Sequence, residues 1–226
     1  MSKKAEKTGE LIVVSGFSGV GKGTIIGRAM QARDDFDFSV SATTRAPREG
    51  EEHGVQYFFL SREDFEQRIA DGKFLEYAEY SGNYYGTLRD YVDELISTGK
   101  NVVLDVDYRG AFAIDANDER ARLIFIIPPS AEALYARLTG RGTETEESII
   151  KRINQAITEA DQADKYNCIL VNDDLDLAVE EFLAIVDDPE LDRKFYEKNL
   201  ELIPPIKSGL KRILEDLRGP EEGEIE

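Results

Sequence analysis

The fold is decided by the stretch Gly16-Phe17-Ser18-Gly19-Val20-Gly21-Lys22-Gly23-Thr24. It follows the apolar run Leu11–Val14 and precedes a helical pattern that contains Ile25, Ile26 and Ala29. In this setting glycines let backbone N–H groups turn inward, while the helix amino terminus and a lysine attract an anion. The stretch therefore predicts a phosphate-binding loop, and every residue in it is a candidate ATP contact.

One position departs from the usual pattern of such loops. A Ser or Thr normally follows the lysine and contacts magnesium, whereas this chain has Gly23 and then Thr24. We therefore expect no assured direct protein ligand for Mg²⁺ from the loop. The Gly-Lys-Gly-Thr ending resembles that of adenylate kinases, so the loop indicates a nucleotide-binding kinase and leaves its acceptor open.

Short apolar runs elsewhere in the chain predict further buried strands. They are Tyr57–Leu60, Val102–Val106, Leu123–Ile127 and Cys168–Val171. Helical patterns lie between them at Ser61–Ala70, Leu88–Thr98, Ser130–Leu138 and Glu146–Asp164, the last with an apolar stripe from Ile149 to Ala160. This alternation predicts an α/β fold, a mainly parallel sheet flanked by helices.

Composition narrows the classes of function. The chain has 226 residues and a formal net charge of −18. That charge repels nucleic acid, so we expect no nucleic-acid partner, and an anion site requires a local concentration of basic groups. The chain has no apolar run long enough to span a bilayer and no signal peptide in its polar first residues, so we expect a cytoplasmic protein without a membrane partner. The single Cys168 and single His53 exclude an intramolecular disulfide and a multi-histidine metal cage.

A basic pair in the segment after the loop is suited to phosphate. Arg45 and Arg48 flank Pro47, which restrains the chain between them. Two guanidinium forks can hold a phosphate through paired hydrogen bonds. The alternative is that both are solvated arginines paired with Glu49 and Glu51.

From about residue 10 to 187 the chain resembles guanylate kinases, and several motifs carry the resemblance in order. They are Ser41-Ala42-Thr43-Thr44-Arg45-Ala46-Pro47-Arg48-Glu49-Gly50-Glu51, Tyr57-Phe58-Phe59, Phe74-Leu75-Glu76, Gly82-Asn83-Tyr84-Tyr85-Gly86-Thr87, Leu104-Asp105-Val106-Asp107, Arg137-Leu138, Gly140-Arg141-Gly142, Arg152 and Val171-Asn172-Asp173-Asp174. The family transfers the γ-phosphoryl group of ATP to GMP, giving ADP and GDP, in purine nucleotide metabolism and GMP recycling. The resemblance implies the same activity here, with Mg²⁺ accompanying ATP.

The resemblance also assigns the acceptor site. It implies that Arg45, Arg48, Tyr57 and Tyr85 hold the GMP phosphate. It implies that Glu76 accepts hydrogen bonds from guanine, supported by the residues Ser41, Thr87 and Asp107. Guanine offers N–H donors where adenine presents an acceptor, so a carboxylate at this place should select guanine.

On the donor side, the resemblance implies cations around the γ-phosphate and a water-mediated metal contact. The cations are Lys22, Arg137, Arg141 and Arg152, with Asn172 as a further ATP contact. Asp105 would position magnesium through water. Asp105 and Asp107 lie two residues apart after an apolar run, so strand periodicity predicts that both carboxylates share one face. The neighbouring Tyr108-Arg109 departs from the family pattern, and no role follows for Arg109.

The resemblance divides the chain into three parts: a polar tail at 1–9, the kinase domain at 10–187, and a charged extension at 188–226. Within the domain it places the phosphate loop at 16–24, the GMP-binding region at about 41–87 and a lid at about 138–152. The extension is predicted to be an appendage, helical with a break at Pro204-Pro205 and then disordered. It could form a dimer helix or a solvated end, so the oligomeric state stays open.

Two other functions fit parts of the pattern. A non-catalytic guanylate-kinase-like interaction module would use the GMP groove to hold a protein, but such modules usually lack a working phosphate loop, whereas Gly16, Gly21, Lys22, Asp105 and Arg141 are all present. A kinase for phosphorylated ribose would leave Glu76 and Ser41 without a guanine partner.

Overall fold

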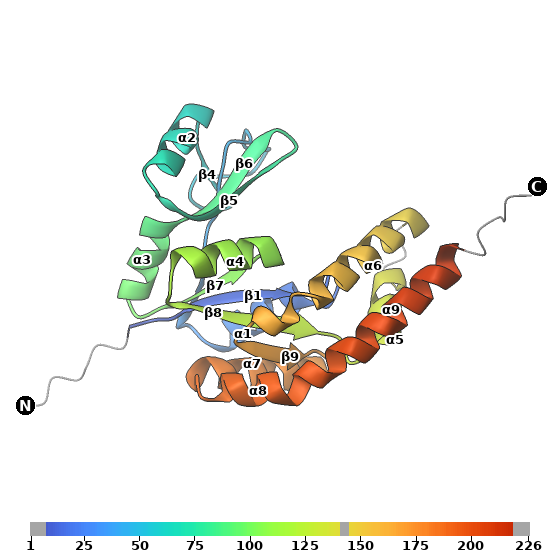
Figure 1. Ribbon diagram of the computed structural model, residues 1–226. Helices are drawn as coiled ribbons and strands as arrows, with labels where there is room; N and C mark the ends of the chain where they lie inside the picture. Colours follow the sequence, from blue (N-terminus) through green and yellow to red (C-terminus); the bar gives the residue numbers. More distant parts are fainter. Residues whose placement is uncertain (1–7, 141–144, 219–226) are drawn as a thin grey trace, which may run out of the picture. The chain divides into compact units, whose positions relative to one another are not determined.

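The computed structural model describes residues 8–140 and 145–218 (Figure 1). The chain divides into two compact units. The first comprises Met1–Val13 and Met30–Arg122, and the second comprises Val14–Ala29 and Leu123–Glu226. The boundary between the units falls within the first strand, between Val13 and Val14, just before the phosphate loop.

The larger sheet confirms the predicted α/β fold. Its strands are β1 (Leu11–Gly16), β2 (Phe36–Phe38), β7 (Asn101–Asp105), β8 (Ala121–Ile127) and β9 (Cys168–Val171), in the order β2-β7-β1-β8-β9. The pairs β2–β7 and β8–β9 are parallel, with Phe36 opposite Asn101 and Ile124 opposite Cys168. Most residues of β1, β7, β8 and β9 are buried, which explains why their sequences read as continuous apolar runs.

A second, smaller sheet belongs wholly to the first unit. It consists of β3 (Ala42–Thr43), β4 (Phe58–Phe59), β5 (Phe74–Tyr80) and β6 (Asn83–Leu88), in the order β4-β3-β6-β5. The β3–β6 and β5–β6 pairs are antiparallel. Its core consists of the buried residues Ala42, Phe65, Phe74 and Leu88. Of its four strands, the sequence predicted only β4, within the run Tyr57–Leu60, and its two residues are half-buried rather than buried as predicted.

Three helices complete the first unit: α2 (Arg62–Ala70), α3 (Arg89–Ser97) and α4 (Tyr108–Asn117). Ser61 caps α2, because the Asp64 backbone N–H donates to Ser61 Oγ at 3.0 Å. Asp107 caps α4 by accepting from the N–H groups of Arg109 and Gly110. Strand β7 ends at Asp105, so the predicted two-residue periodicity does not extend to Asp107, which is a helix cap rather than a strand residue.

The helices that follow β1 and β8 in the chain are α1 (Lys22–Ala32), α5 (Ala131–Thr139), α6 (Glu146–Ala160), α7 (Leu175–Asp187), α8 (Leu191–Asn199) and α9 (Ile203–Arg218), with short 3₁₀ turns at Ala163–Lys165 and Leu200–Leu202. Within the described ranges, none of the helices has both the length and the apolar character required to cross a bilayer.

The described part of the C-terminal extension is an integral layer of the second unit rather than the appendage that the sequence predicted. Helix α9 packs against α5 and α6 (Figure 1). It buries apolar residues at helical spacing, namely Ile203, Ile206, Leu210 and Leu214. The approach is close, because a Cβ atom added at Gly209 would lie 2.6 Å from Ala131 Cβ. The prolines 204 and 205 stand in the first turn of α9, where a missing N–H costs little, and so they do not interrupt a helix.

Candidate functional site

The phosphate loop joins β1 to α1, and its main chain requires glycine at two places. Gly16 has φ 149°, and a Cβ atom there would lie 2.2 Å from the Ile126 carbonyl oxygen. Gly21 has φ 98°, and a Cβ atom there would lie 2.8 Å from Asn172 Nδ2. Both conformations are strained for other residues, so these glycines fix the shape of the loop.

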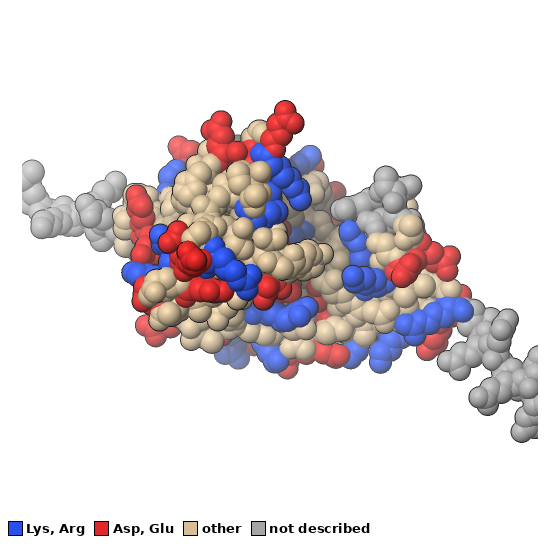
Figure 2. All heavy atoms as spheres, turned by 90° about the horizontal axis from the view of Figure 1, so that it is seen from above, with Lys and Arg blue, Asp and Glu red and all other residues tan. Residues whose placement is uncertain are grey.

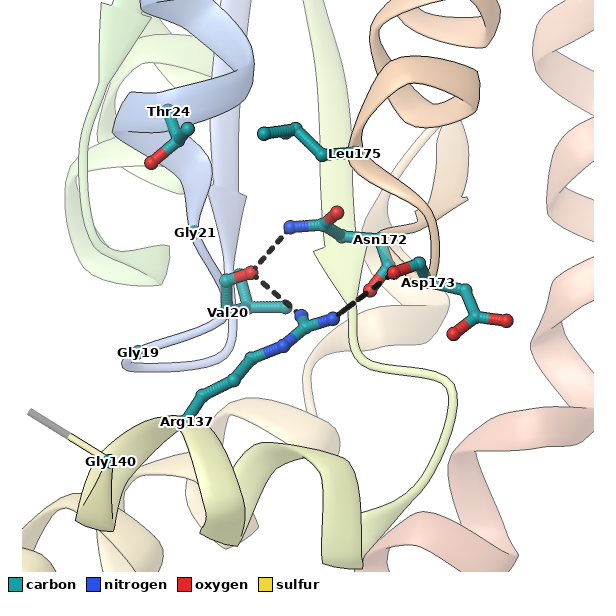
Figure 3. A pocket seen from close by; sticks show the side chains of 9 residues that line it. All are labelled: Gly19, Val20, Gly21, Thr24, Arg137, Gly140, Asn172, Asp173 and Leu175. Atoms are coloured by element: carbon teal, nitrogen blue, oxygen red, sulfur yellow. Dashed lines mark hydrogen bonds between the residues drawn. The ribbon is translucent and has the colours of Figure 1, made fainter.

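A cavity of about 420 Å³ lies beside this loop (Figure 3). Its wall consists of Gly19, Val20, Gly21, Thr24, Arg137, Gly140, Asn172, Asp173 and Leu175. Arg137 reaches across one side of it, donating from Nη1 to the Val20 carbonyl at 3.2 Å and from Nη2 to the Asn172 carbonyl at 2.7 Å. The Asn172 side chain also donates to the Val20 carbonyl, at 2.8 Å. Hydrogen bonds to main-chain carbonyls therefore join the loop to α5 and to the segment after β9.

Only some of the predicted donor-side residues are brought together around this cavity. Val20, Arg137 and Asn172 are brought together by the bonds just described, and Thr24 lines the same cavity. Lys22 is in the first turn of α1, where its Nζ lies 3.4 Å from the Gly16 carbonyl oxygen. Arg152 is half-buried on α6. Arg141 lies outside the described residues.

Sequence reasoning missed one contact of the loop. The Ser18 backbone N–H donates to Glu159 Oε2 at 2.7 Å, and Gln155 Nε2 donates to Glu159 Oε1 at 2.8 Å. Glu159 is only 2% exposed. A signal was available, because Glu159 interrupts the apolar stripe of α6 between Ala156 and Ala160, and a buried acid requires partners.

In the first unit, Glu51 contacts both arginines of the predicted phosphate clamp, Arg45 and Arg48. Arg45 Nη2 lies 2.9 Å from Glu51 Oε1, and the backbone N–H of Arg48 donates to the other carboxylate oxygen at 2.7 Å. The pairing of Arg45 with Glu51 that the alternative interpretation predicted is therefore present, but the two side chains are only 16% and 17% exposed, so the pair is not fully solvated. Hydrogen bonds from Arg45 and from the Arg48 backbone hold the pKa of Glu51 below its usual value.

Aromatic rings bring both predicted tyrosines close to this arginine. The Arg45 guanidinium carbon lies 5.4 Å from the centre of the Tyr57 ring, and the Tyr57 and Tyr85 ring centres are 6.1 Å apart. Glu51 raises the pKa of Arg45, and Tyr85 adds to the effect, so the guanidinium stays charged. The side chain of Arg48 is exposed. Arg45, Tyr57 and Tyr85 thus form one cluster with a fixed cation.

The predicted guanine-binding residues meet on the smaller sheet. Thr87 Oγ1 donates to Glu76 Oε1 at 2.7 Å, because the β5–β6 register sets these residues opposite each other. Ser41 immediately precedes β3, whose antiparallel register pairs Ala42 with Gly86. Burial raises the pKa of Glu76, the Thr87 hydrogen bond opposes that rise, and the charge of Asp107 adds to it.

Glu76 and Asp107 both line a cavity of about 410 Å³ in the first unit. Its other lining residues include Tyr77, Val106, Arg109 and Gly110. Arg109 Nε lies 3.4 Å from Asp107 Oδ2. Arg109, to which the sequence analysis assigned no role, therefore lines this cavity beside Glu76 and Asp107 and partly balances their charge.

The described residues suit a magnesium ion that arrives with a nucleotide better than one held by the protein alone. Among the residues described, no group of three or more His, Cys, Asp or Glu side chains could hold a metal. Asp105 is exposed at the carboxyl end of β7. Magnesium keeps several waters and is commonly bound through one or two carboxylates plus substrate phosphates. The exposed carboxylate of Asp105 is consistent with this mode of binding.

The net charge of −18 does not preclude local basic sites. Figure 2 shows lysine and arginine side chains interspersed among acidic ones on the visible face. Arg45 and Arg137 in their respective units provide fixed cations.

A family model described as guanylate kinase matches residues 8–188 of this chain. The chain belongs to the guanylate kinase family. It is 50% identical over 183 residues to a guanylate kinase of Shouchella clausii, which covers 81% of this chain and 89% of the relative. It is 48% identical over 181 residues to a guanylate kinase of Halalkalibacterium halodurans, with 80% of this chain and 89% of that relative covered.

Similarity to a solved structure supports the same family assignment. The crystal structure of guanylate kinase from Anaplasma phagocytophilum is similar with a TM-score of 0.58 and 30% sequence identity, over 80% of this chain and 86% of that one. The guanylate kinase match ends at residue 188, so α8 and α9 lie beyond it.

Proposed function

We propose that this protein is a nucleoside monophosphate kinase that transfers the γ-phosphoryl group of ATP to GMP, giving ADP and GDP, in purine nucleotide metabolism and GMP recycling. Membership of the guanylate kinase family supports the reaction class. The observation that carries the choice of acceptor is the Glu76 carboxylate, which lines a cavity and accepts from Thr87 at 2.7 Å. Its second oxygen is suited to the N–H donors of guanine.

In this proposal the acceptor is gripped at both ends in the first unit. Arg45 and Arg48, with the hydroxyl groups of Tyr57 and Tyr85, bind the GMP phosphate. Glu76 binds the base, with Ser41, Thr87 and Asp107 in support. The preformed Arg45–Glu51 pair supports the phosphate assignment, because a cation that is already oriented loses little freedom on binding.

The donor is bound by the phosphate loop, Gly16 to Thr24, with Asn172 beside it. Phosphoryl transfer depends mainly on positioning and on neutralising charge in the transition state. Lys22, Arg137, Arg141 and Arg152 are proposed to supply that neutralisation. The existing bonds from Arg137 to main-chain carbonyls support a positioning role for this arginine as well.

Magnesium would enter as the ATP complex, and it would supply charge neutralisation at the phosphates. Asp105 would hold its waters, and Thr24 and Gly23 would make no required contact. The exposed carboxylate at the end of β7 supports this assignment.

The domain limits follow the same proposal. The kinase domain is assigned to 10–187, with the GMP-binding region at about 41–87 and a lid at about 138–152, of which 141–144 lie outside the described residues. Residues 1–9 and 188–226 flank it. The single cysteine, which excludes an intramolecular disulfide, supports a further proposal that the protein works in the cytoplasm.

The acceptor preference is tested by measuring ADP release with GMP, AMP, CMP and UMP in turn. We expect kcat/KM for GMP to exceed each of the others by at least about a hundredfold, as for sites built to pair with a specific hydrogen-bonding pattern. Equal use of AMP would contradict the assignment. GMP binding without phosphoryl transfer would favour the non-catalytic interaction module instead.

A further inference from the structure

The proposed reaction assigns no role to the buried carboxylate of Glu159 in the second unit. It is 2% exposed, and its hydrogen bonds include one to each carboxylate oxygen. One comes from the Ser18 main chain at 2.7 Å, and the other from the side chain of Gln155, one helical turn earlier, at 2.8 Å. Burying a carboxylate is costly, so its retention calls for a structural gain.

The Glu159 carboxylate does not increase the affinity of the phosphate loop for an anion. A carboxylate hydrogen-bonded to a phosphate loop lies near the phosphates that the loop binds, and like charges repel. The carboxylate also uses the Ser18 N–H, which is then unavailable to phosphate. The remaining gain is geometric, because the bond fixes the direction of one peptide unit inside a loop whose glycines allow many backbone conformations.

The same carboxylate connects the loop to α6. Arg152 and Glu159 are both on this helix, seven residues apart. At this spacing they lie on the same side of the helix, with a separation of about 10 Å along its axis. A bond that holds Glu159 to Ser18 therefore also sets the position of Arg152 relative to the loop that carries Lys22.

We propose that Glu159 is a positioning residue for the donor site, which holds the phosphate loop in its ATP-binding shape and sets the register of α6 against it. The inference rests on the proposed function of that loop. It concerns a hydrogen bond rather than a charge. An uncharged acceptor of the same shape should therefore preserve the effect.

The kinetic test compares Glu159→Met with Glu159→Gln. Methionine fills the space but cannot accept from Ser18, so we expect the KM for ATP to rise about tenfold or more, with the KM for GMP within about twofold of wild type. Glutamine retains an acceptor and lacks the opposing charge, so its KM for ATP should equal or fall below that of wild type. Thr158→Ala is the matched control, because this exposed neighbour donates only to the Asn154 carbonyl of the same helix.

Three results would overturn the inference: an unchanged KM for ATP in Glu159→Met, a defect in Glu159→Gln as large as in Glu159→Met, or an equal rise in the KM for both substrates. If the wild type itself lacked GMP phosphorylation, the proposed function would fail instead. Hydrogen exchange of the Ser18 amide in the unliganded wild type needs neither a variant nor activity. We expect this amide to be protected, and rapid exchange at the rate of an open loop would also overturn the inference.

Discussion

The phosphate loop in the second unit and the arginine clamp in the first unit both suit a phosphate group, but they are built from different parts of the chain. The loop uses main-chain geometry, since Gly16 and Gly21 adopt conformations with positive φ and Arg137 is held by carbonyl oxygens. The clamp uses side chains that already hold one another, since Glu51 binds Arg45 and the backbone of Arg48. Changes in the loop should therefore affect the reacting phosphoryl group, whereas changes in the clamp should affect the affinity for the acceptor.

The largest expected effect is on the donor side. Lys22→Ala should lower kcat by about two to three orders of magnitude and leave the KM for GMP nearly unchanged, because the ammonium meets charge that develops on the transferring group. Steady-state kinetics with both substrates varied would measure this. Arg28→Ala is a suitable control, since Arg28 is on the same helix and forms an exposed ion pair with Asp176. A change in the KM for GMP alone would contradict the assignment of the loop.

On the acceptor side, Arg45→Ala should raise the KM for GMP by about tenfold to a hundredfold and alter kcat much less, because the guanidinium binds a phosphate that is not the leaving group. Arg62→Ala is the matched control in the same unit, an arginine that pairs with Glu66 at the surface. If Arg45→Ala lowered kcat without changing the KM for GMP, the two regions would not differ as described.

The magnesium contact sharpens the comparison, because one candidate residue, Thr24, belongs to the loop and the other, Asp105, ends β7. Asp105→Asn should raise the magnesium concentration for half-maximal rate by about tenfold, as expected for a residue that acts through bound water. Thr24→Val should change it only a few-fold, because Thr24 is one residue past the usual position and its side chain is turned by about 100°. Magnesium titrations at saturating ATP and GMP would test both variants. If Thr24→Val had a severe defect that added magnesium reversed, while Asp105→Asn was nearly normal, the metal contact would have to be assigned to the loop instead.

The smallest expected effect is a pH shift in the guanine site. Burial raises the pKa of Glu76, and the Thr87 hydrogen bond counteracts this rise. Since only the carboxylate accepts from guanine, the KM for GMP should increase as the pH falls through that raised pKa. Thr87→Val removes the counteracting bond, so the increase should begin at a higher pH than in wild type, by a few-fold in KM at a given acidic pH.

Wild type and Thr87→Val are measured with the same substrate, so protonation of the GMP phosphate affects both pH profiles equally and cancels from their difference. Coincident profiles, or a shift of the Thr87→Val profile to lower pH, would contradict the proposed role of the Glu76 carboxylate.

The sequence predicted the larger sheet except for its short edge strand β2, whereas it predicted only β4 of the smaller sheet. Strands such as β8 are apolar almost throughout because both faces are covered, and a continuous apolar run is easily found. Strand β5 is buried only at Phe74 and Leu75 and is exposed over its second half, so it has no such run. Strands β3 and β4 have two residues each, too few for any periodicity to show.

The site residues were predictable as motifs, but their contacts were not. The bond between Glu76 and Thr87 depends on the register of β5 against β6, which residue spacing alone does not reveal. Asp107 was assigned to a strand face because β7 was expected to continue, whereas the chain turns there into α4. Glu159 is 141 positions from Ser18 in the chain, so only the tertiary structure brings the two together.

The most direct test of the whole account is a product analysis with purified protein, ATP, GMP and magnesium, in which all four nucleotides are separated and quantified over time. The account predicts that ADP and GDP form in equal amounts, and that neither forms when GMP is omitted. Formation of ADP without GDP would contradict it, because the donor site would then release phosphate to water rather than to the acceptor bound in the first unit.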